Sequence, residues 1–367
     1  MPTLSAPGVD SQVTFRELLS PSRELVDSAL AEFLAGKRRA AAREAPAAAV
    51  LVDAVESLVA AGGKRLRPIL VLETFRALGG APPERALPAA LATELLHAYL
   101  LIHDDIMDHA ELRRGRPTAH VAFEHLHEGQ GLSGDRADFG RSMAILAGDL
   151  AASFAAELFA ATPAPAPLAR RLGSAYAAMT EEVIWGQFLE LVAGRTAQPS
   201  EADLLAVLRL KSGRYSVERP IELGALLAEA GEETLRDLAI LGEALGEVFQ
   251  LKDDLLGLFG DPERTGKAVG GDLLEGKFTF PLHHALTAAG PAERRLLAAV
   301  RGNPASTPDE LARALDLIAQ RGGVARVHEM IAQRLATARE LLPRLPLSPA
   351  GRRFFEALIA YSEEREE

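Results

Sequence analysis

The chain has 367 residues, of which 48% are hydrophobic, so it is long enough to bury a large core. Lys and Arg number 40 against 51 Asp and Glu, and the net charge of -11 argues against general nucleic-acid binding. The absence of cysteine excludes disulfides, thiolate metal sites and a cysteine nucleophile. Neither a secretory signal nor an apolar run of about 18 residues occurs, so we expect a cytoplasmic protein without a stable membrane span.

Helices are predicted along the whole chain, because Ala, Leu, Glu and Arg are frequent and apolar residues recur at three- and four-residue spacing. The predicted helices cover residues 11–36, 44–61, 67–79, 85–109, 118–128, 137–161, 166–193, 200–213, 215–230, 233–259, 277–289, 307–320, 322–342 and 349–364. Turn-sized segments rich in Gly and Pro separate many of them. With no long polar linker and few runs of β-branched residues, this pattern predicts a single all-α domain.

A first acidic segment ends the apolar helix predicted at 85–109. Asp104 and Asp108 are one helical turn apart and therefore share a face, with Asp105 beside them. Three clustered carboxylates repel one another unless cations intervene, and ligands that are all oxygen suit Mg2+ or Mn2+. The alternative is a solvated acidic helix end.

A second acidic segment lies about 150 residues later, at 249–257. It holds Asp253 and Asp254, with Gln250 one turn earlier, but position 257 is Gly, which leaves one carboxylate fewer. Carboxylates are rarely buried unless they are paired or bind metal. Two such segments facing each other could hold several divalent cations, and those cations could hold a diphosphate.

Basic residues accompany the acidic segments. Arg113 and Arg114 follow the first one, and guanidinium groups bind phosphate oxygens in a bidentate manner. Upstream, the glycines at 62–63 would let the backbone approach a ligand, while Lys64 and Arg67 add positive charge. Salt-bridge clusters and a basic loop before a helix are the alternatives. Polar residues on apolar helices complete the set: Gln187 and Lys211.

In this order and spacing, the motifs resemble those of the trans-isoprenyl diphosphate synthases, the polyprenyl synthetase family. The matching segments are GGKRLRP at 62–68, ELLHAYLLIHDDIMD at 94–108, LRRGRP at 112–117, GQFLE at 186–190, KSGRYS at 211–216, FQLKDDLLG at 249–257 and EGKFTFP at 275–281. The resemblance implies an all-α, single-domain isoprenoid synthase fold, with antiparallel helices around a central cavity, and a homodimer. We assign residues 46–367 to the catalytic domain and residues 1–45 to an N-terminal helical extension.

The resemblance also implies a reaction and its residues. An allylic diphosphate would condense head-to-tail with isopentenyl diphosphate, with three Mg2+ ions per active site or Mn2+ in their place. The implied metal ligands are Asp104, Asp105, Asp108, Asp253 and Asp254. The implied ligands of the allylic diphosphate, which we also group with the catalytic residues, are Arg113, Lys211 and Lys267. The implied isopentenyl diphosphate site comprises Gly63, Lys64, Arg67, His97 and Arg114. Further substrate-binding positions are Gln187, Gln250 and Lys277.

Three positions depart from the family pattern. Gly257 stands where many relatives carry the last Asp of the second motif, which often acts through water, so we expect metal binding to survive. Glu190 replaces an Asp and Ser212 replaces a Thr, and both changes look tolerable.

Product length depends on the residues one helical turn before Asp104, namely Tyr99 and Leu100. Tyr99 is bulky and should block very long chains, whereas Leu100 leaves more depth than a second aromatic would. With the spacing of the first motif, the resemblance favours geranylgeranyl diphosphate, with farnesyl diphosphate next. An ordinary core aromatic is the alternative interpretation of Tyr99.

Three other functions compete. A class I terpene cyclase would not need the GGKRLRP segment. An HD-type phosphohydrolase, suggested by His103 and Asp104, would need histidine ligands spread along the chain. A non-catalytic synthase subunit would have lost at least one acidic motif, whereas this chain keeps both.

Overall fold

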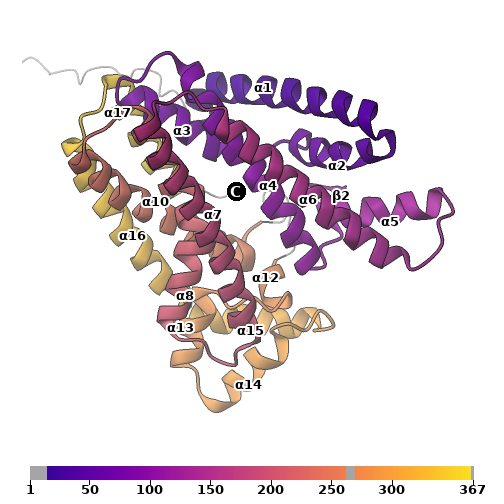
Figure 1. Ribbon diagram of the computed structural model, residues 1–367. Helices are drawn as coiled ribbons and strands as arrows, with labels where there is room; N and C mark the ends of the chain where they lie inside the picture. Colours follow the sequence, from indigo (N-terminus) through magenta and orange to yellow (C-terminus); the bar gives the residue numbers. More distant parts are fainter. Residues whose placement is uncertain (1–14, 262–268, 365–367) are drawn as a thin grey trace, which may run out of the picture.

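The computed structural model describes residues 15–261 and 269–364, and this part of the chain is almost entirely helical (Figure 1). The first helices are α1 Phe15–Glu44, α2 Ala49–Ala60, α3 Leu66–Ala77, α4 Leu87–Met107, α5 Ala119–Gly129, α6 Arg136–Ala160, α7 Ala166–Arg195 and α8 Glu201–Val207. The later ones are the π-helix Leu208–Glu218, α9 Arg219–Leu227, α10 Glu232–Phe259, α12 Gly271–Leu274, α13 Phe280–Ala288, α14 Pro291–Val300, α15 Pro308–Gln320, α16 Gly323–Leu341 and α17 Pro349–Glu364. Short 3-10 helices cover Pro46–Ala48, Pro83–Arg85 and Leu342–Arg344. The all-α prediction is confirmed.

Long helices form the body of the molecule. Helix α4 packs against α3 and α6, while the π-helix packs against both α7 and α10. Helix α1 contacts α2, α3, α4 and α17, and α13–α15 lie at the opposite end of the molecule from α1 and α2 (Figure 1). The acidic ends of α4 and α10 thereby come to one region between these long helices.

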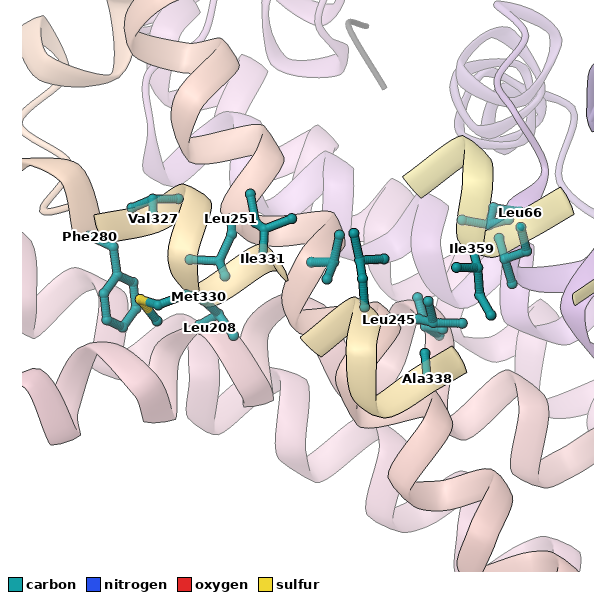
Figure 2. Packing of buried hydrophobic residues seen from close by; sticks show 14 of the residues in the cluster. Leu66, Leu208, Leu245, Leu251, Phe280, Val327, Met330, Ile331, Ala338 and Ile359 are labelled. Carbon is teal, nitrogen blue, oxygen red and sulfur yellow. The ribbon is translucent and has the colours of Figure 1, made fainter. Parts of the chain in front are cut away.

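Buried aliphatic residues hold α10 and α16 together. Figure 2 shows Leu245 and Leu251 of α10 among Ile331 and Ala338 of α16. These side chains are at most 5% exposed, so their burial stabilises the frame that carries the second acidic segment. A second cluster of buried side chains joins α1, α2, α3, α4, α6 and α7 in the same way.

Glycines bring α7 and α10 unusually close to the π-helix. A Cβ on Gly186 of α7 would lie 2.2 Å from the backbone nitrogen of Lys211, and one on Gly246 of α10 would lie 2.4 Å from the carbonyl oxygen of Gly213. No side chain fits at such distances, so both contacts depend on glycine. The π-helix, which is a rare form often found at functional sites, is clamped between its two neighbours.

Several predicted boundaries are wrong. The helices predicted at 200–213 and 215–230 form one continuous helical segment, because Gly213 serves close packing and not a turn. Helix α14 was not predicted. Nor was the two-stranded hairpin of β1 Leu112–Arg113 and β2 Arg116–Pro117, which turns at Arg114 and Gly115 with φ of 53° and 73°. Helix α13 begins at Phe280, so Lys277 lies before it and not within it.

Within the described residues, one helix is long and apolar enough to cross a membrane, namely α6. It packs against α2, α4 and α5 as part of the bundle, and 39% of its most apolar window is buried.

Candidate active site

A cavity of about 610 Å³ lies between α4, α7, the π-helix, α10 and the segment from Asp272 to Phe280. Most of the predicted site residues line it: Gly63, Lys64, Arg67, His97, Asp104, Arg113, Arg114, Lys211, Gln250, Asp253, Asp254 and Lys277. The cavity walls between these groups are apolar, with Leu101, Leu208 and Phe249 among them. Segments more than 200 residues apart in the sequence, such as those of Gly63 and Lys277, therefore converge on one chamber.

Asp104 sits where α4, α7 and the π-helix meet. The Gln187 side-chain amide donates a hydrogen bond of 2.9 Å to its Oδ1, and the Lys211 ammonium lies 3.4 Å from the same atom. Burial alone would raise the pKa of Asp104, but Lys211, Lys277 and Arg113 outweigh it and hold the pKa below its ordinary value. Asp104 is therefore ionised. Gln187 does not line the cavity itself but orients Asp104 from α7.

Asp105 is held by the hairpin. Its side chain is almost fully buried and accepts a hydrogen bond of 2.7 Å from Arg113 Nε. The tight turn at Arg114 and Gly115 folds the hairpin back towards α4 and so makes this pair. Asp105 fixes Arg113 and does not itself line the cavity.

Asp108 caps the C-terminus of α4, where its backbone nitrogen bonds to the Asp104 carbonyl oxygen at 2.8 Å. Burial, followed by the negative charge of Asp104, raises the pKa of Asp108 to about 6. Lys277 opposes this shift from 3.9 Å. The Lys277 ammonium also lies 3.6 Å from Asp272, so Lys277 bridges Asp108 at the end of α4 and Asp272 of α12.

The second acidic cluster lies on the last turns of α10. Asp254 accepts hydrogen bonds from the Gln250 amide at 2.8 Å and from the Phe280 backbone nitrogen at 3.4 Å. Burial is the main cause that raises the pKa of Asp254 to about 7, and the charges of Asp272 and Asp253 act in the same direction. Lys211 stays protonated, because the attraction of Glu190 and Asp104 outweighs the effect of its burial on its pKa.

These carboxylates fit a hard divalent cation. Every donor is an oxygen, which matches the preference of Mg2+. Among the described residues, no group of three acidic or histidine side chains is arranged to hold an ion alone. Such an ion would use one or two carboxylates and complete its shell with phosphate oxygens and water, as Mg2+ usually does.

A basic region of the same cavity lies beside the loop at 62–68. Arg67 donates hydrogen bonds to the Tyr215 hydroxyl at 2.7 Å and to Ser216 Oγ at 2.6 Å. Gly63 has a φ of 153°, which favours glycine, and a Cβ there would lie 3.1 Å from the Arg114 guanidinium, so the glycine lets Arg114 pack closely against the loop. Burial, together with Arg67 and Arg114, lowers the pKa of His97 well below its usual value and keeps the imidazole neutral.

A buried ion-pair network that the sequence analysis missed supports this loop. Arg65 is 5% exposed and has a φ of 50°, and it donates hydrogen bonds of 2.7 Å to Glu94 of α4 and to Asp27 of α1. Glu94 stands alone in the apolar run LATELLH, which is the signal that could have revealed it. The network fixes the backbone between Lys64 and Arg67.

The remaining predicted residues lie elsewhere. Tyr99 and Leu100 do not line the cavity, and the ring of Tyr99 packs edge-on against His103 with 4.8 Å between centroids. Leu101, the next residue, does line it. Lys267 lies outside the described residues.

The family model for polyprenyl synthetases matches residues 48–318 of the chain. Geranylfarnesyl diphosphate synthase of Aeropyrum pernix is 35% identical over 313 residues, which are 84% of this chain and 92% of the relative. Farnesyl diphosphate synthase of Geobacillus stearothermophilus is 34% identical over 77% of this chain and 88% of its own length.

Among solved structures, geranylgeranyl pyrophosphate synthase of Corynebacterium glutamicum, complexed with isoprenyl diphosphate and magnesium, superimposes with a TM-score of 0.89. It shares 33% identity and covers 96% of this chain and 100% of its own. The chain belongs to the polyprenyl synthetase family and has the isoprenoid synthase fold. It is a prenyltransferase of isoprenoid biosynthesis, a trans-prenyl diphosphate synthase that uses an allylic diphosphate and isopentenyl diphosphate.

Proposed function

We propose that this synthase extends its allylic substrate to geranylgeranyl diphosphate, with the residues of the cavity in the roles that follow. The observation that carries the proposal is that two sets of cationic side chains line different parts of one chamber. Arg113 and Lys211 lie beside the acidic clusters, whereas Arg67 and Arg114 belong to the basic region of the cavity beside the loop at 62–68. One chamber can thus receive two diphosphates in different electrostatic settings.

The acidic clusters would hold Mg2+, three ions per site, with Mn2+ as an alternative. The proposed ligands are Asp104, Asp108, Asp253 and Asp254, together with Asp105, whose carboxylate would have to give up its ion pair with Arg113. When bound, the ions neutralise the growing negative charge of the departing diphosphate.

The chain's own residues would carry the rest of the reaction. Arg113, Lys211 and Lys267 bind the allylic diphosphate and stabilise it as the C–O bond breaks and its electron pair leaves with the diphosphate. Lys64, Arg67 and Arg114 hold isopentenyl diphosphate so that its double bond attacks the allylic cation. The apolar walls exclude water, which would otherwise capture that cation. A proton then leaves, and an oxygen of the departing diphosphate accepts it.

Product length would follow from Tyr99 and Leu100, which precede Asp104 by about one turn of α4. A chain that grows along α4 away from the acidic cluster would pass Leu101, which lines the cavity, and would have to extend beyond the present cavity wall to reach Tyr99 and Leu100. Farnesyl diphosphate is the second candidate product, and the Geobacillus stearothermophilus relative carries that name.

The protein would form a homodimer, because large apolar side chains are exposed on α6 and α7. Ile145 and Leu146 of α6 are 46% and 50% exposed, and Trp185 and Phe188 of α7 are 54% and 64% exposed. Large apolar side chains at this exposure favour a protein partner over water. A second copy of the chain, packed against α6, is the proposed partner, and the cytoplasm is the proposed compartment.

A product assay tests the proposal. Purified protein is incubated with Mg2+, labelled isopentenyl diphosphate and, separately, dimethylallyl, geranyl and farnesyl diphosphates, and chain length is determined after dephosphorylation. We expect a twenty-carbon product, and we expect Asp104→Ala or Asp253→Ala to lower turnover at least about a hundredfold. Glu111→Ala, an exposed acid beside the first motif, is the control. Activity near the wild-type level in either aspartate variant would contradict the metal assignment.

A further inference from the structure

Arg301, the residue that follows α14, joins two segments beside the catalytic cavity. One terminal nitrogen of its guanidinium donates hydrogen bonds to the carbonyl oxygens of Gly194 at 2.9 Å and Gly276 at 3.3 Å. The other donates to the Thr196 carbonyl oxygen at 3.2 Å. Gly194 and Thr196 belong to the C-terminal end of α7, where carbonyl groups lack partners within the helix. The guanidinium therefore ties the end of α7 to the turn at Gly276.

The turn that Arg301 contacts carries Lys277. Gly276 precedes this lysine, and Phe278 follows it, with the centre of its ring 4.9 Å from the Arg301 guanidinium carbon. Arginine stacks well on aromatic faces, so this contact holds the ring as the hydrogen bond holds the backbone. Lys277 and Phe278 line the cavity, whereas Arg301 does not. Arg301 thus contacts both neighbours of Lys277 from outside the chamber.

Two glycines let the turn after α14 approach this segment closely. A Cβ on Gly276 would lie 3.3 Å from the Cα of Gly302, and the two residues have positive φ of 86° and 72°. The Gly302 backbone nitrogen donates a hydrogen bond of 2.9 Å to the Leu273 carbonyl oxygen. The backbone next to Arg301 is therefore fixed against the same segment, and the guanidinium needs little ordering to reach it.

The surroundings of Lys277 make the position of its backbone important. The ammonium lies 3.9 Å from Asp108, 3.6 Å from Asp272 and 2.9 Å from Glu275. A lysine carries its charge on a flexible four-carbon stem, so several pairings with these carboxylates are open to it. The place where the stem begins determines which of them the ammonium reaches.

We propose that Arg301 is a positioning residue of the substrate site: it holds the turn at 276–278 against the end of α7 and so places the Lys277 ammonium for a diphosphate at the acidic clusters. This inference rests on the proposed function and on the substrate-binding role that the resemblance implies for Lys277. Helix α14, which does not line the cavity, thereby contributes to the site.

A double-mutant cycle on the full chain tests the inference. Binding of inorganic diphosphate in the presence of Mg2+ is measured by titration calorimetry in the wild type, Arg301→Gln, Lys277→Ala and the double variant. We expect Arg301→Gln to weaken binding about tenfold when Lys277 is present and less than about twofold when it is absent. Arg301→Lys keeps the charge but lacks the fork that reaches both segments, so it should weaken binding as Arg301→Gln does.

Arg294→Gln is the matched control. Arg294 lies on α14 and also donates to backbone carbonyl oxygens, those of Ala289 at 2.9 Å and Thr287 at 3.5 Å, but these belong to the end of α13. Its replacement should leave diphosphate binding within about twofold of the wild type.

Steady-state kinetics adds a measurement that a general loss of stability would not reproduce. Lys277 lies beside the acidic clusters and not in the basic region at 62–68. Arg301→Gln should therefore raise the KM for the allylic diphosphate about fivefold or more and change the KM for isopentenyl diphosphate less than about twofold.

Three results would overturn the inference: unchanged diphosphate binding in Arg301→Gln, an equal loss with and without Lys277, or full binding in Arg301→Lys. The cycle is run with Arg301→Lys if the glutamine variant does not fold. The product assay on the wild type is independent of the cycle. A wild type that binds diphosphate but elongates no starter would overturn the proposed function and leave the result for Arg301 standing.

Discussion

At the scale of single residues, Asp108 and Asp254 bind protons more tightly than ordinary aspartates do. Burial first, and neighbouring carboxylates second, raise the pKa of Asp108 to about 6 and that of Asp254 to about 7. A carboxyl group whose pKa is higher in the folded state stabilises the fold below its unfolded pKa of about 4 and loses this contribution as pH rises through the folded pKa. The metal-free protein should therefore lose stability as pH rises from about 5 to 8.

A proton-release experiment tests this pH dependence. A cation binds the ionised carboxylates, so binding of Mg2+ with inorganic diphosphate should release protons near pH 6.5 and should weaken by up to about tenfold per pH unit below 7. Calorimetry in two buffers with different ionisation enthalpies measures the number of protons released. Asp254→Asn should release fewer. Equal heats in both buffers, after correction for protons released by the diphosphate itself, would refute the raised pKa values.

Tyr99 is the second residue for which a direct test exists. If its ring limits the depth available to the growing chain, Tyr99→Ala should lengthen the product by one or more isoprene units, whereas Tyr99→Phe, which keeps the ring, should not. Chain length after reaction of farnesyl diphosphate with isopentenyl diphosphate is the measurement. Since Tyr99 packs on His103 and does not line the cavity, an unchanged profile in Tyr99→Ala would place the floor at other side chains.

At the scale of elements, close contact between α7 and the π-helix positions Lys211. A methyl group on Gly186 would meet backbone atoms of Lys211 and Leu210, which cannot move as a side-chain end can. We expect Gly186→Ala to lower the free energy of unfolding by about 1–3 kcal/mol and to reduce turnover by displacing Lys211. Denaturant unfolding and the product assay measure the two effects.

Gly173 provides the control on the same helix. A Cβ there meets nothing within 4 Å, so Gly173→Ala should stabilise the protein by about 0.5–1 kcal/mol through helix propensity alone. If both alanine variants were equally stable and active, the close approach of α7 to the π-helix would not be needed to place Lys211.

The same elements show what the sequence could and could not predict. Helical periodicity and the motifs were sufficient for the long helices, the family and most of the charged residues that line the cavity. The π-helix was missed because glycine usually breaks helices. The presence of Gly213 inside this helix is explained by its close packing against the backbone of Gly246, which the sequence does not show. The pair of Arg65 with Glu94 was missed because it joins positions whose proximity depends on helix packing.

At the scale of the whole molecule, α6 has too much apolar surface for a helix that faces water. It is the one described helix with the length and composition of a membrane span, yet only 39% of its most apolar window is buried. Its inner face packs on α2, α4 and α5, which leaves Ile145 and Leu146 outside. Because α6 also contacts α4, which carries Asp104, a partner packed on α6 would brace the first acidic cluster from behind.

Introducing a charge on this face tests the proposed homodimer. Ile145→Asp would bury a carboxylate without a partner in the dimer, so we expect the dissociation constant to rise about a hundredfold or more. Ile240→Asp is the matched control, because Ile240 of α10 is the same residue type at the same 46% exposure. Sedimentation velocity over a concentration series measures both. A dimer that persists in Ile145→Asp and dissociates in Ile240→Asp would place the interface on α10. A monomeric wild type would contradict the homodimer, and the catalytic cavity would then be complete within one chain.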